Sequence, residues 1–493
     1  MRYPYDAVSG QEVELKLEIA PDAAEALIAS GLLPGRPSVV PLRSVYFDTP
    51  EHDLSAAGFS LRIRQAGDRR IQTVKAAGTA AAGLFARPEW ERGVEGDAPV
   101  LDDATPVKAF LGGKVHDIGP AFAVEVERRI WIVSSPDATI EVALDSGEVV
   151  AGERRTRVHE IELELKDGAP AALFALARRI DSVAPARVGV LNKAERGFLL
   201  LGPAMRAFKA EPVLLAADMS AADAFRHIAG VCLRQFRLNE ALIGRDNAEA
   251  LHQARVALRR LRCAFSIFEP MLRDDSVERL RAELRWLAGA LGDARDFDVL
   301  GGRAAVETVR ARLETVRHRA YDAAETALSS PRARALMLDL SQWLVLGGWL
   351  AQASAETARG QPASDFAVAT LERLRKKVKK GGTDLADLGD EARHELRKDA
   401  KKLRYAAEFF ASLFQGKRHK RRLGPFLAAL ESLQDRLGAL NDLASAPDLL
   451  ARTGLRDDPA AAALLDEGKG RQALVEAAAE AHDAFVDTRR FWR

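Results

Sequence analysis

Hydrophobic and charged residues alternate along the first part of the chain, from Glu12 to about Lys166. A period of two places one kind of side chain on each face of a β-strand. We therefore predict antiparallel strands that each have one apolar and one charged face, with turn-rich segments between them. The clearest examples are EVELKLE from Glu12, LRIR from Leu61 and EIELELK from Glu160.

From Ser220 onward the hydrophobic period is 3.6 and alanine, leucine and arginine dominate, which predicts an all-helical region of antiparallel helices. Residues 205–217 show no clear period and are predicted to form a linker. The predicted fold class is multi-domain α+β. It has an N-terminal antiparallel β barrel with flanking helices over residues 1–204, and a C-terminal domain of duplicated helical bundles over residues 218–493.

The helical region contains a basic segment that occurs twice. HQARVALRRLR begins at His252, and HELRKDAKKLR begins 142 residues later at His394. In each copy the histidine is followed by Arg at +3, two basic residues at +7 and +8, and Arg at +10. On a helix, positions 0, +3, +7 and +10 fall within an arc of about 80°, so each copy predicts one basic stripe opposite a buried apolar face.

The duplication extends beyond these helices, because LGDARDFDVL from Leu291 is echoed by LGALNDLAS from Leu437. We therefore predict two pseudo-symmetric halves, at about 218–350 and 351–493. The second copy carries Lys401 and Lys402 in place of the arginine pair, which keeps the charge but loses the bidentate guanidinium geometry.

Composition favours a water-soluble intracellular protein. The 493 residues are 47% hydrophobic, the formal net charge is +1, and there are only two cysteines. These values give no disulfide framework, and the N-terminus contains no apolar segment typical of a signal peptide. The longest apolar stretch, around residues 343–351, is shorter than a bilayer span. We expect a cytoplasmic location, no membrane association, and electrostatic function from local charge clusters.

The charges on the predicted strands are segregated. A charged strand face is ordinarily the solvent side of an antiparallel sheet, but here carboxylates gather on some strands and guanidinium groups on others. A closed barrel can line its lumen with such charges. Such a lumen would bind a metal ion and a polyanion together.

The same segments resemble the CYTH family of triphosphate tunnel enzymes. The resemblance rests on ExExK at Glu12 to Lys16, VYFDTP from Val45, LRIR, TVK ending at Lys75, RPEWE from Arg87, IEVALDSG from Ile140, EIELEL and NKAERG from Asn192. It implies a metal-dependent triphosphatase that uses Mg²⁺ or Mn²⁺. The implied metal ligands are Glu12, Glu14, Glu141, Asp145, Glu162 and Glu164. The implied triphosphate-binding or catalytic residues are Lys16, Arg62, Arg64, Lys75, Glu89, Glu91, Arg129 and Lys193, with Arg128 as the alternative to Arg129.

The duplicated helical region is similar to the CHAD family, the conserved histidine α-helical domain, and this resemblance points to inorganic polyphosphate as the ligand. Arginine groups one helical turn apart suit a flexible chain of phosphates. An exposed face paired with carboxylates is the alternative interpretation, and the repetition of histidine and arginine in register favours phosphate binding over it. The histidines could bind ligand or be structural. The candidate polyphosphate-binding residues are His252, Arg255, Arg259, Arg260, Arg262, His394, Arg397, Lys401, Lys402 and Arg404.

Two other functions fit the sequence. The barrel could hydrolyse an organic triphosphate such as thiamine triphosphate or a nucleotide, or the whole chain could bind polyphosphate without catalysis. Nucleic acid is disfavoured, because the basic helices lack interleaved aromatic residues and the net charge is near zero. Association with polyphosphate granules is expected, and a homodimer is compatible with the sequence.

Overall fold

The structure is a computed structural model that describes residues 12–76, 79–81, 83–465 and 469–493. The chain forms two compact units. Unit 1 contains Met1–Arg206 together with Pro331–Leu346, and unit 2 contains Ala207–Ser330 and Gly347–Arg493. The chain therefore leaves unit 2 after Ser330, contributes one helix to unit 1, and returns at Gly347.

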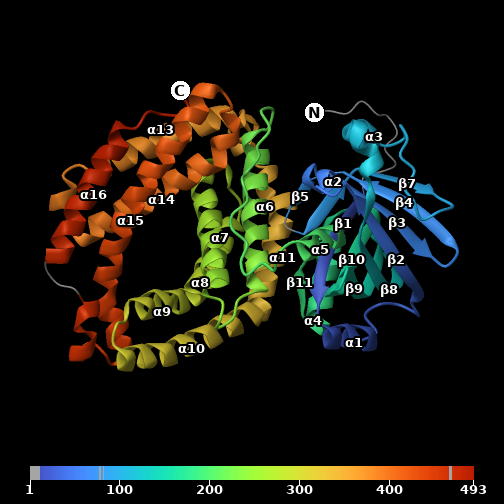
Figure 1. The fold of residues 1–493 in the computed structure, drawn as a ribbon, viewed down its shortest axis with the longest axis horizontal. Coiled ribbons are helices and arrows are strands. Elements are labelled where there is room, and N and C mark those ends of the chain that lie inside the picture. Colours follow the sequence, from blue (N-terminus) through green and yellow to red (C-terminus); the bar gives the residue numbers. More distant parts are fainter. Residues whose placement is uncertain (1–11, 77–78, 82, 466–468) are drawn as a thin grey trace. The chain divides into compact units, whose positions relative to one another are not determined.

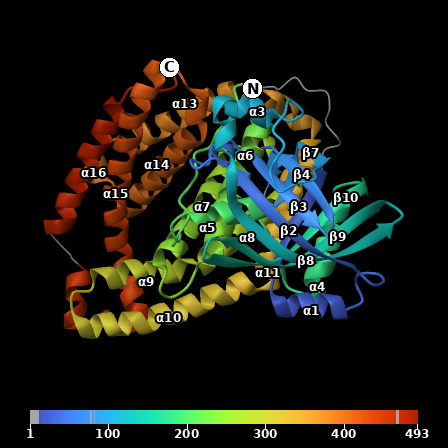
Figure 2. The same cartoon turned by 45° about the vertical axis from the view of Figure 1, so that its right-hand side comes forward.

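Unit 1 is built on one mainly antiparallel sheet, drawn in blue to green in Figure 1, with strand order β5-β6-β1-β10-β9-β8-β2-β3-β4-β7 and β11 also paired with β1. Figure 2 shows the long strands β8, β9 and β10 extending side by side. The strands are β1 (Glu12–Ile19), β2 (Ser38–Asp48), β3 (Ser60–Ala66), β4 (Arg69–Lys75), β5 (Thr79–Ala81), β6 (Leu84–Arg87), β7 (Glu89–Gly93), β8 (Gly119–Ser135), β9 (Ala138–Ala151), β10 (Arg154–Gly168) and β11 (Ala186–Val188).

The predicted alternation separates the two faces of this sheet. Leu15 and Leu17 are fully buried on one face of β1, and Leu163 continues that face on β10. The charged residues between them point to the other face. Among the described residues, the strand ladders run from β5 to β7 without a ladder between these two ends, so the predicted closed barrel is not confirmed and the antiparallel sheet is.

Helices cover the apolar face of the sheet. α4 packs on β1 and β10 and buries Phe174, Ala177 and Ile180 completely. α11, the helix contributed from the C-terminal part of the sequence, packs against α4 and β11. The helices of unit 1 are α1 (Pro21–Ala29), α2 (Asp53–Ala56), α3 (Pro106–Leu111), α4 (Ala171–Val183), α5 (Lys193–Leu201) and α11 (Pro331–Leu346).

Unit 2 is all-helical, as the 3.6-residue period predicts. α6 packs along α7, and α13 packs along α14, which in turn packs on α15. The helices are α6 (Ala221–Glu240), α7 (Ala248–Ile267), α8 (Val277–Ala290), α9 (Gly292–Arg303), α10 (Glu307–Ser329), α12 (Glu356–Gly360), α13 (Ala363–Gly381), α14 (Asp390–Phe410), α15 (Lys417–Thr453) and α16 (Lys469–Asp487).

The two copies of the basic segment lie on α7 and α14, which pack against each other. Each helix buries the apolar face that its sequence predicts, including Leu258, Leu261 and Phe265 on α7 and Leu403 and Phe410 on α14. In the part of the chain that the structure describes, no helix is long and apolar enough to cross a membrane.

Candidate functional site

Unit 1 contains a cavity of about 260 Å³ on the charged face of its sheet. Side chains from β1, β2, β3, β4, β7, β8, β9 and β10 and from the first turn of α5 line it. Carboxylates and cations both line the cavity. The charged lining residues are Glu14, Lys16, Arg62, Arg64, Lys75, Glu89, Glu91, Arg128, Glu141, Glu162, Glu164, Lys166 and Lys193.

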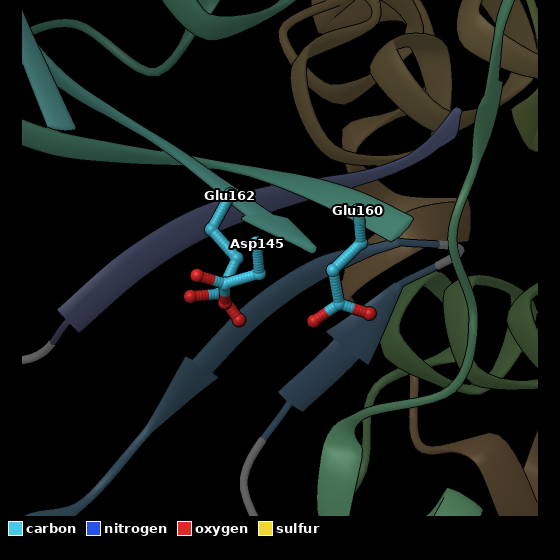
Figure 3. A group of neighbouring side chains, drawn as sticks. All are labelled: Asp145, Glu160 and Glu162. Atoms are coloured by element: carbon cyan, nitrogen blue, oxygen red, sulfur yellow. The ribbon is translucent and has the colours of Figure 1, made fainter. Parts of the chain in front are cut away.

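Three carboxylates gather at one end of this charged face. One oxygen from each of Asp145, Glu160 and Glu162 lies within 4.8 Å of the others. The register explains the grouping, because Glu160 pairs with Asp145 across β10 and β9, and Glu162 follows two residues later on the same face. Figure 3 shows the three side chains projecting to the same side of the strands. Oxygen donors of this kind are the ligands that Mg²⁺ and Mn²⁺ prefer.

Three cations contact the same carboxylates. Lys193 Nζ lies 2.6 Å from Asp145 and 3.0 Å from Glu162, and it also contacts Glu160. Arg128 Nη2 lies 2.6 Å from Asp145 and 2.5 Å from Glu162, which also contacts Lys16. The carboxylates and cations therefore form one buried network in which each charge is paired.

The ion pairs keep Glu162 and Lys193 ionised. Burial would raise the pKa of Glu162, but the charges of Lys16, Lys193 and Arg128 hold that pKa well below its ordinary value. Burial would lower the pKa of Lys193, but Asp145, Glu160 and Glu162 together raise it. The cavity is therefore lined by a carboxylate and an ammonium group that are both charged at neutral pH.

The NKAERG segment forms the start of α5 and delivers Lys193 to the cavity. Asn192 is the N-cap, its side chain accepts a hydrogen bond from the backbone N–H of Glu195, and the Glu195 side chain accepts one from Asn192, which makes a capping box. Arg196 Nη2 pairs with Glu18 at 2.6 Å. Gly197 lies flat on Phe122, where a Cβ atom would come within 2.1 Å of the ring. These local contacts fix the direction of the Lys193 side chain.

Another wall of the cavity carries two arginines of β3. Arg62 Nη1 lies 3.4 Å from the Tyr46 hydroxyl, and Arg64 Nε lies 3.4 Å from Ser44 Oγ. Among the described residues, neither guanidinium group has a carboxylate within ion-pair distance. Burial and the nearby charges of Arg62 and Arg128 lower the pKa of Arg64 to about 10. This wall therefore has positive charge that an anionic ligand would stabilise.

The remaining charged residues pair across neighbouring strands. Lys75 lies 3.3 Å from Glu89, and the Thr73 hydroxyl donates to Glu91 at 3.0 Å. Lys166, which was not among the predicted residues, lies 2.6 Å from Glu164. The register places Glu14, Glu164 and Glu141 side by side on β1, β10 and β9, so a second row of carboxylates faces the cavity.

The structure brings most of the predicted residues of unit 1 together, with one correction. Arg129 lies on the opposite face of β8, 2.9 Å from Glu127 and 39% exposed, whereas Arg128 points into the cavity. The alternation of β8 decides this, because Arg128 pairs in register with Asp145. The side chain of Glu12 lies outside the described residues.

Sequence reasoning also missed Glu160 and Tyr46. Glu160 lies two residues before Glu162 and therefore shares its face, so the alternation of β10 could have identified it. Tyr46 lies two residues after Ser44 on the inward face of β2 and is 3% exposed. Its pKa is lowered despite burial, because Arg62, Arg64 and Lys193 are near its hydroxyl.

Unit 2 has its own cationic site, a groove of about 570 Å³ between α7, α8, α13 and α14. We call it the α7–α14 groove. Its predicted members come from both copies of the basic segment and are Arg259, Arg262, His394, Arg397, Lys401 and Lys402. Arg281, Arg285, Lys377 and Lys398 add further positive charge, whereas Glu269, Glu395 and Asp399 are the carboxylates in the lining.

Four predicted residues do not line the groove. Arg260 is buried and pairs with Glu408 at 2.8 Å, and Arg404 lies 3.6 Å from Glu431. His252 is half-buried beside Arg295, Arg259 and Arg255, and burial and these charges lower its pKa. Arg255 donates to the Ala288 carbonyl at 3.1 Å. Arg255, Arg260 and Arg404 connect neighbouring helices, a role that the sequence pattern alone does not distinguish from ligand binding.

Each copy places a glycine against the guanidinium group of its own first arginine. A Cβ atom on Gly292 would lie 3.3 Å from Arg255 Nη1, and one on Gly438 would lie 3.4 Å from Arg397 Nη2. Each glycine therefore leaves room for the guanidinium group of the matching copy. The histidines are less alike, because His394 Nδ1 lies 2.6 Å from Asn441 Oδ1 whereas the equivalent position near His252 is Arg295.

Lys401 lies near three arginines in the α7–α14 groove. Burial lowers its pKa, and Arg259, Arg397 and Arg404 lower it further, to about 7, although Asp442 opposes them. Arg397 also has a buried Nε without a hydrogen-bond partner. A lysine and an arginine in this state are poorly solvated and poorly paired, which is the condition that an anion relieves.

Unit 1 is thus an antiparallel-sheet domain with a cavity lined by carboxylates and cations, and unit 2 is a duplicated helical domain with a cationic groove. Residues 10–198 match the CYTH domain family, and residues 227–451 match the CHAD domain family. The chain is a CYTH-CHAD protein.

Several known proteins are similar to it. An inorganic triphosphatase of Haemophilus influenzae is 32% identical over 200 residues, which are 38% of this chain and 55% of that protein, so the match spans about half of its length. An uncharacterized protein of Mycobacterium tuberculosis is 28% identical over 404 residues, or 74% of this chain and 75% of that protein. The crystal structure of the CHAD domain from the plant Ricinus communis is 31% identical, covers 58% of this chain and 97% of that chain, and has a TM-score of 0.48.

Proposed function

We propose that unit 1 hydrolyses inorganic triphosphate and short polyphosphate in its charged cavity. The observation that carries this proposal is the mixed lining of the cavity. Arg62 and Arg64 line it without carboxylate partners among the described residues, and Glu162 lines it as the member of the cluster of Asp145, Glu160 and Glu162 that reaches the cavity. A linear triphosphate needs cations along its length and a hard metal ion at its reacting end, and these groups supply binding partners for both.

The carboxylate cluster fits Mg²⁺ or Mn²⁺, because its donors are all oxygens and lie close enough to share one ion. Asp145, Glu160 and Glu162 would hold the ion. When bound, such an ion polarises phosphoryl oxygen and lowers the pKa of bound water. The similarity of this chain to an inorganic triphosphatase and its match to the CYTH family support this assignment at the level of the family.

The protein's own residues bind and orient the substrate. Arg62, Arg64 and Lys75 would bind phosphoryl oxygens, since guanidinium and ammonium groups stabilise the charge that develops during phosphoryl transfer. Lys16, Lys193 and Arg128 are tied to carboxylates in the free protein, so they are already oriented toward the cavity. Hydrolysis by direct attack of water needs no covalent nucleophile.

The test measures phosphate release from tripolyphosphate with Mg²⁺ or Mn²⁺. We expect Glu162→Gln and Arg64→Met each to lower kcat/KM by about 100-fold or more, because each removes a charge that the transition state needs. Glu127→Gln and Arg129→Met are matched controls on the outer face of β8, where the two residues pair with each other in solvent. They should change kcat/KM by less than about twofold.

The outcomes separate the alternatives. Full activity of Glu162→Gln would reject the proposed site. Turnover of thiamine triphosphate or a nucleotide, but not of tripolyphosphate, would reject the inorganic substrate. Tight binding of polyphosphate without any turnover would show that the chain is a noncatalytic polyphosphate-binding protein.

We further propose that the α7–α14 groove of unit 2 binds inorganic polyphosphate. Its cations come from several helices, and they include Lys401 and Arg397, whose burial without close counter-ions favours an anionic ligand. Polyphosphate is preferred to nucleic acid because the described lining holds no exposed Phe, Tyr or Trp ring to stack on bases, since Phe265 is 1% exposed. A cytoplasmic location and association with polyphosphate granules stay predictions.

A further inference from the structure

A second group of cations lies at the start of α15 and the end of the chain, outside the α7–α14 groove. The KRHKRR segment begins α15 at Lys417, and the last residues of the chain pack beside it. We call Arg418, Arg421, Arg422, Arg489, Arg490 and Arg493 the C-terminal cationic cluster. Neither the hydrolytic cavity nor the groove uses any of them.

This cluster has few compensating carboxylates. Glu372 of α13 pairs with Arg490 at 3.2 Å and with Arg493 at 2.7 Å, and it also accepts a hydrogen bond from Trp492. In the described part of the chain, Arg418, Arg421 and Arg489 take part in no ion pair or hydrogen bond. Partial desolvation and the charges of Arg418, Arg489 and Arg421 lower the pKa of Arg422, which shows that these groups are near one another.

The cluster sits on a rigid support. Arg422 Nη1 donates to the carbonyl oxygens of Arg490, at 3.2 Å, and Arg493, at 2.7 Å, which ties the start of α15 to the last residues. Phe491 and Trp492 are buried against Phe426. The backbone that carries the arginines is therefore held in place before any ligand binds, and less conformational entropy is lost on binding.

The start of α15 adds to the positive field. The first turn of this helix contains no acidic residue, although carboxylates are the side chains that stabilise a helix N-terminus. Basic residues at this end repel the positive end of the helix dipole. The arrangement costs stability in the free protein, and a bound anion would offset that cost.

We propose that the C-terminal cationic cluster is a second binding site for linear inorganic polyphosphate, distinct from the α7–α14 groove. The proposal rests on the proposed polyphosphate-binding role of unit 2 and extends it to a separate surface. The ligand chemistry is a flexible chain of charged phosphates without bases or acyl groups.

Two features of the surface favour this ligand over other polyanions. Phe491 and Trp492 are fully or almost fully buried, so the cluster offers no exposed ring to stack on a nucleic acid base. Among the described residues, none of the large exposed hydrophobic side chains lies at the start of α15 or at the end of the chain. A surface that binds an anionic membrane through an amphipathic helix would present such side chains.

The second site gives a reason for unit 2 to prefer long chains. Arg397 in the groove lies beside Gly438 of α15, and Arg421 is 17 residues earlier on the same helix. At the rise of an α-helix this separation is about 25 Å along α15. A long polyphosphate could contact both sites at once, and the linked binding events would raise its apparent affinity.

The experiment measures binding of polyphosphates of graded length to the full chain by a direct titration. The cluster variant is Arg418→Ser, Arg421→Ser and Arg489→Ser, which removes charge without removing any contact that holds the fold. A matched control, Arg273→Ser, Arg319→Ser and Arg456→Ser, removes three other exposed arginines of unit 2. The groove variant is Arg262→Ser with Arg397→Ser. Melting temperatures check that every variant is folded.

We expect the cluster variant to weaken binding of long polyphosphate by about tenfold, to leave tripolyphosphate affinity within about twofold, and to reduce the salt dependence of binding. The control should keep wild-type affinity. Unchanged long-chain affinity in the cluster variant, with a loss in the groove variant, would overturn this inference alone. Unchanged affinity in both variants would reject the proposed groove as well. If single-stranded RNA or anionic vesicles bound the C-terminal cationic cluster more tightly than polyphosphate does, the proposal of a second polyphosphate site would also be overturned, because the ligand would belong to another class.

Discussion

Arg64 and Lys401 are single cations that the fold holds partly buried beside other cations. The pKa of Arg64 falls to about 10 in the cavity of unit 1, and that of Lys401 falls to about 7 in the α7–α14 groove. Burial comes first among the causes in both cases, and neighbouring arginines add to it. A residue in this state is stabilised by an anion, so each marks where phosphate is expected to bind.

Lys401 should make polyphosphate binding depend on pH. The groups that face it are Arg259 from α7, Arg397 and Arg404 from α14, and Asp442 from α15. In the protein without ligand, Lys401 loses its proton as pH rises through about 7. A bound polyanion would raise the pKa of Lys401. Binding above pH 7 is therefore accompanied by uptake of a proton. Affinity should therefore rise by about tenfold from about pH 8.5 to about pH 5.5.

Binding titrations of wild type and Lys401→Arg at matched ionic strength check this expectation. The arginine stays charged across the range, so any pH dependence left in that variant comes from the ligand or from other groups. If the two proteins show the same pH dependence, Lys401 is not the responsible residue.

At the scale of elements, local sequence signals orient some side chains, whereas long-range packing decides where some helices lie. The capping box of α5 is a local feature, and it aims Lys193 at the carboxylates of β9 and β10. α11 has no comparable local signal for its position. It lies within the C-terminal part of the sequence and packs in unit 1, where Arg334 pairs with Asp181 at 2.5 Å and Asp339 pairs with Arg178 at 2.7 Å.

The α11 ion pairs should differ in their effect on stability. Arg334 is 9% exposed and Asp181 also accepts the backbone N–H of Ala186, so Arg334→Ala leaves a partly buried carboxylate without this cation. We expect a loss of about 2 kcal/mol in the free energy of unfolding of unit 1. Arg178 is 40% exposed, and Arg178→Ala should cost less than about 1 kcal/mol.

The stability of the two variants is measured by denaturant titration, with tripolyphosphate hydrolysis as the readout of folded unit 1. Amide hydrogen exchange of β11 and α4 locates the change. Equal midpoints for Arg334→Ala and Arg178→Ala would contradict the assignment of α11 to the core of unit 1.

At the scale of the whole molecule, the chain joins two units that both present groups for phosphate. The cavity of unit 1 is lined by carboxylates as well as cations, whereas cations outnumber carboxylates in the lining of the groove of unit 2. This difference fits a division of roles in which unit 1 performs hydrolysis and unit 2 retains longer chains. The two sites have no lining residue in common.

The two roles should therefore be separable by mutation. Arg262→Ser with Arg397→Ser should weaken polyphosphate binding by about tenfold, since each arginine can make charge-assisted hydrogen bonds to phosphate. The steady-state hydrolysis of tripolyphosphate should stay within about twofold of wild type, because the cavity keeps all its residues. A parallel loss of both activities would show that the sites are coupled.

Much of the fold was predictable because it depends on periodicity. Alternation predicted the strands of unit 1 and the face that holds Glu14, Lys16 and Glu162, and the 3.6-residue period predicted the helices of unit 2. Periodicity cannot show whether the ends of a sheet pair with each other, and the predicted barrel closure is not confirmed. It also cannot tell a ligand-binding cation from a structural one, as Arg260 on Glu408 demonstrates.

The sequence by itself determined which residue types share a face, because side-chain direction follows from the backbone period alone. It also determined that the basic segment and the later glycine each occur twice in unit 2. Only the tertiary structure decided that Arg128 rather than Arg129 reaches Asp145, that Glu160 joins Asp145 and Glu162, and that α11 belongs to unit 1. Strand register and helix docking set these outcomes, and both depend on contacts between residues far apart in the chain.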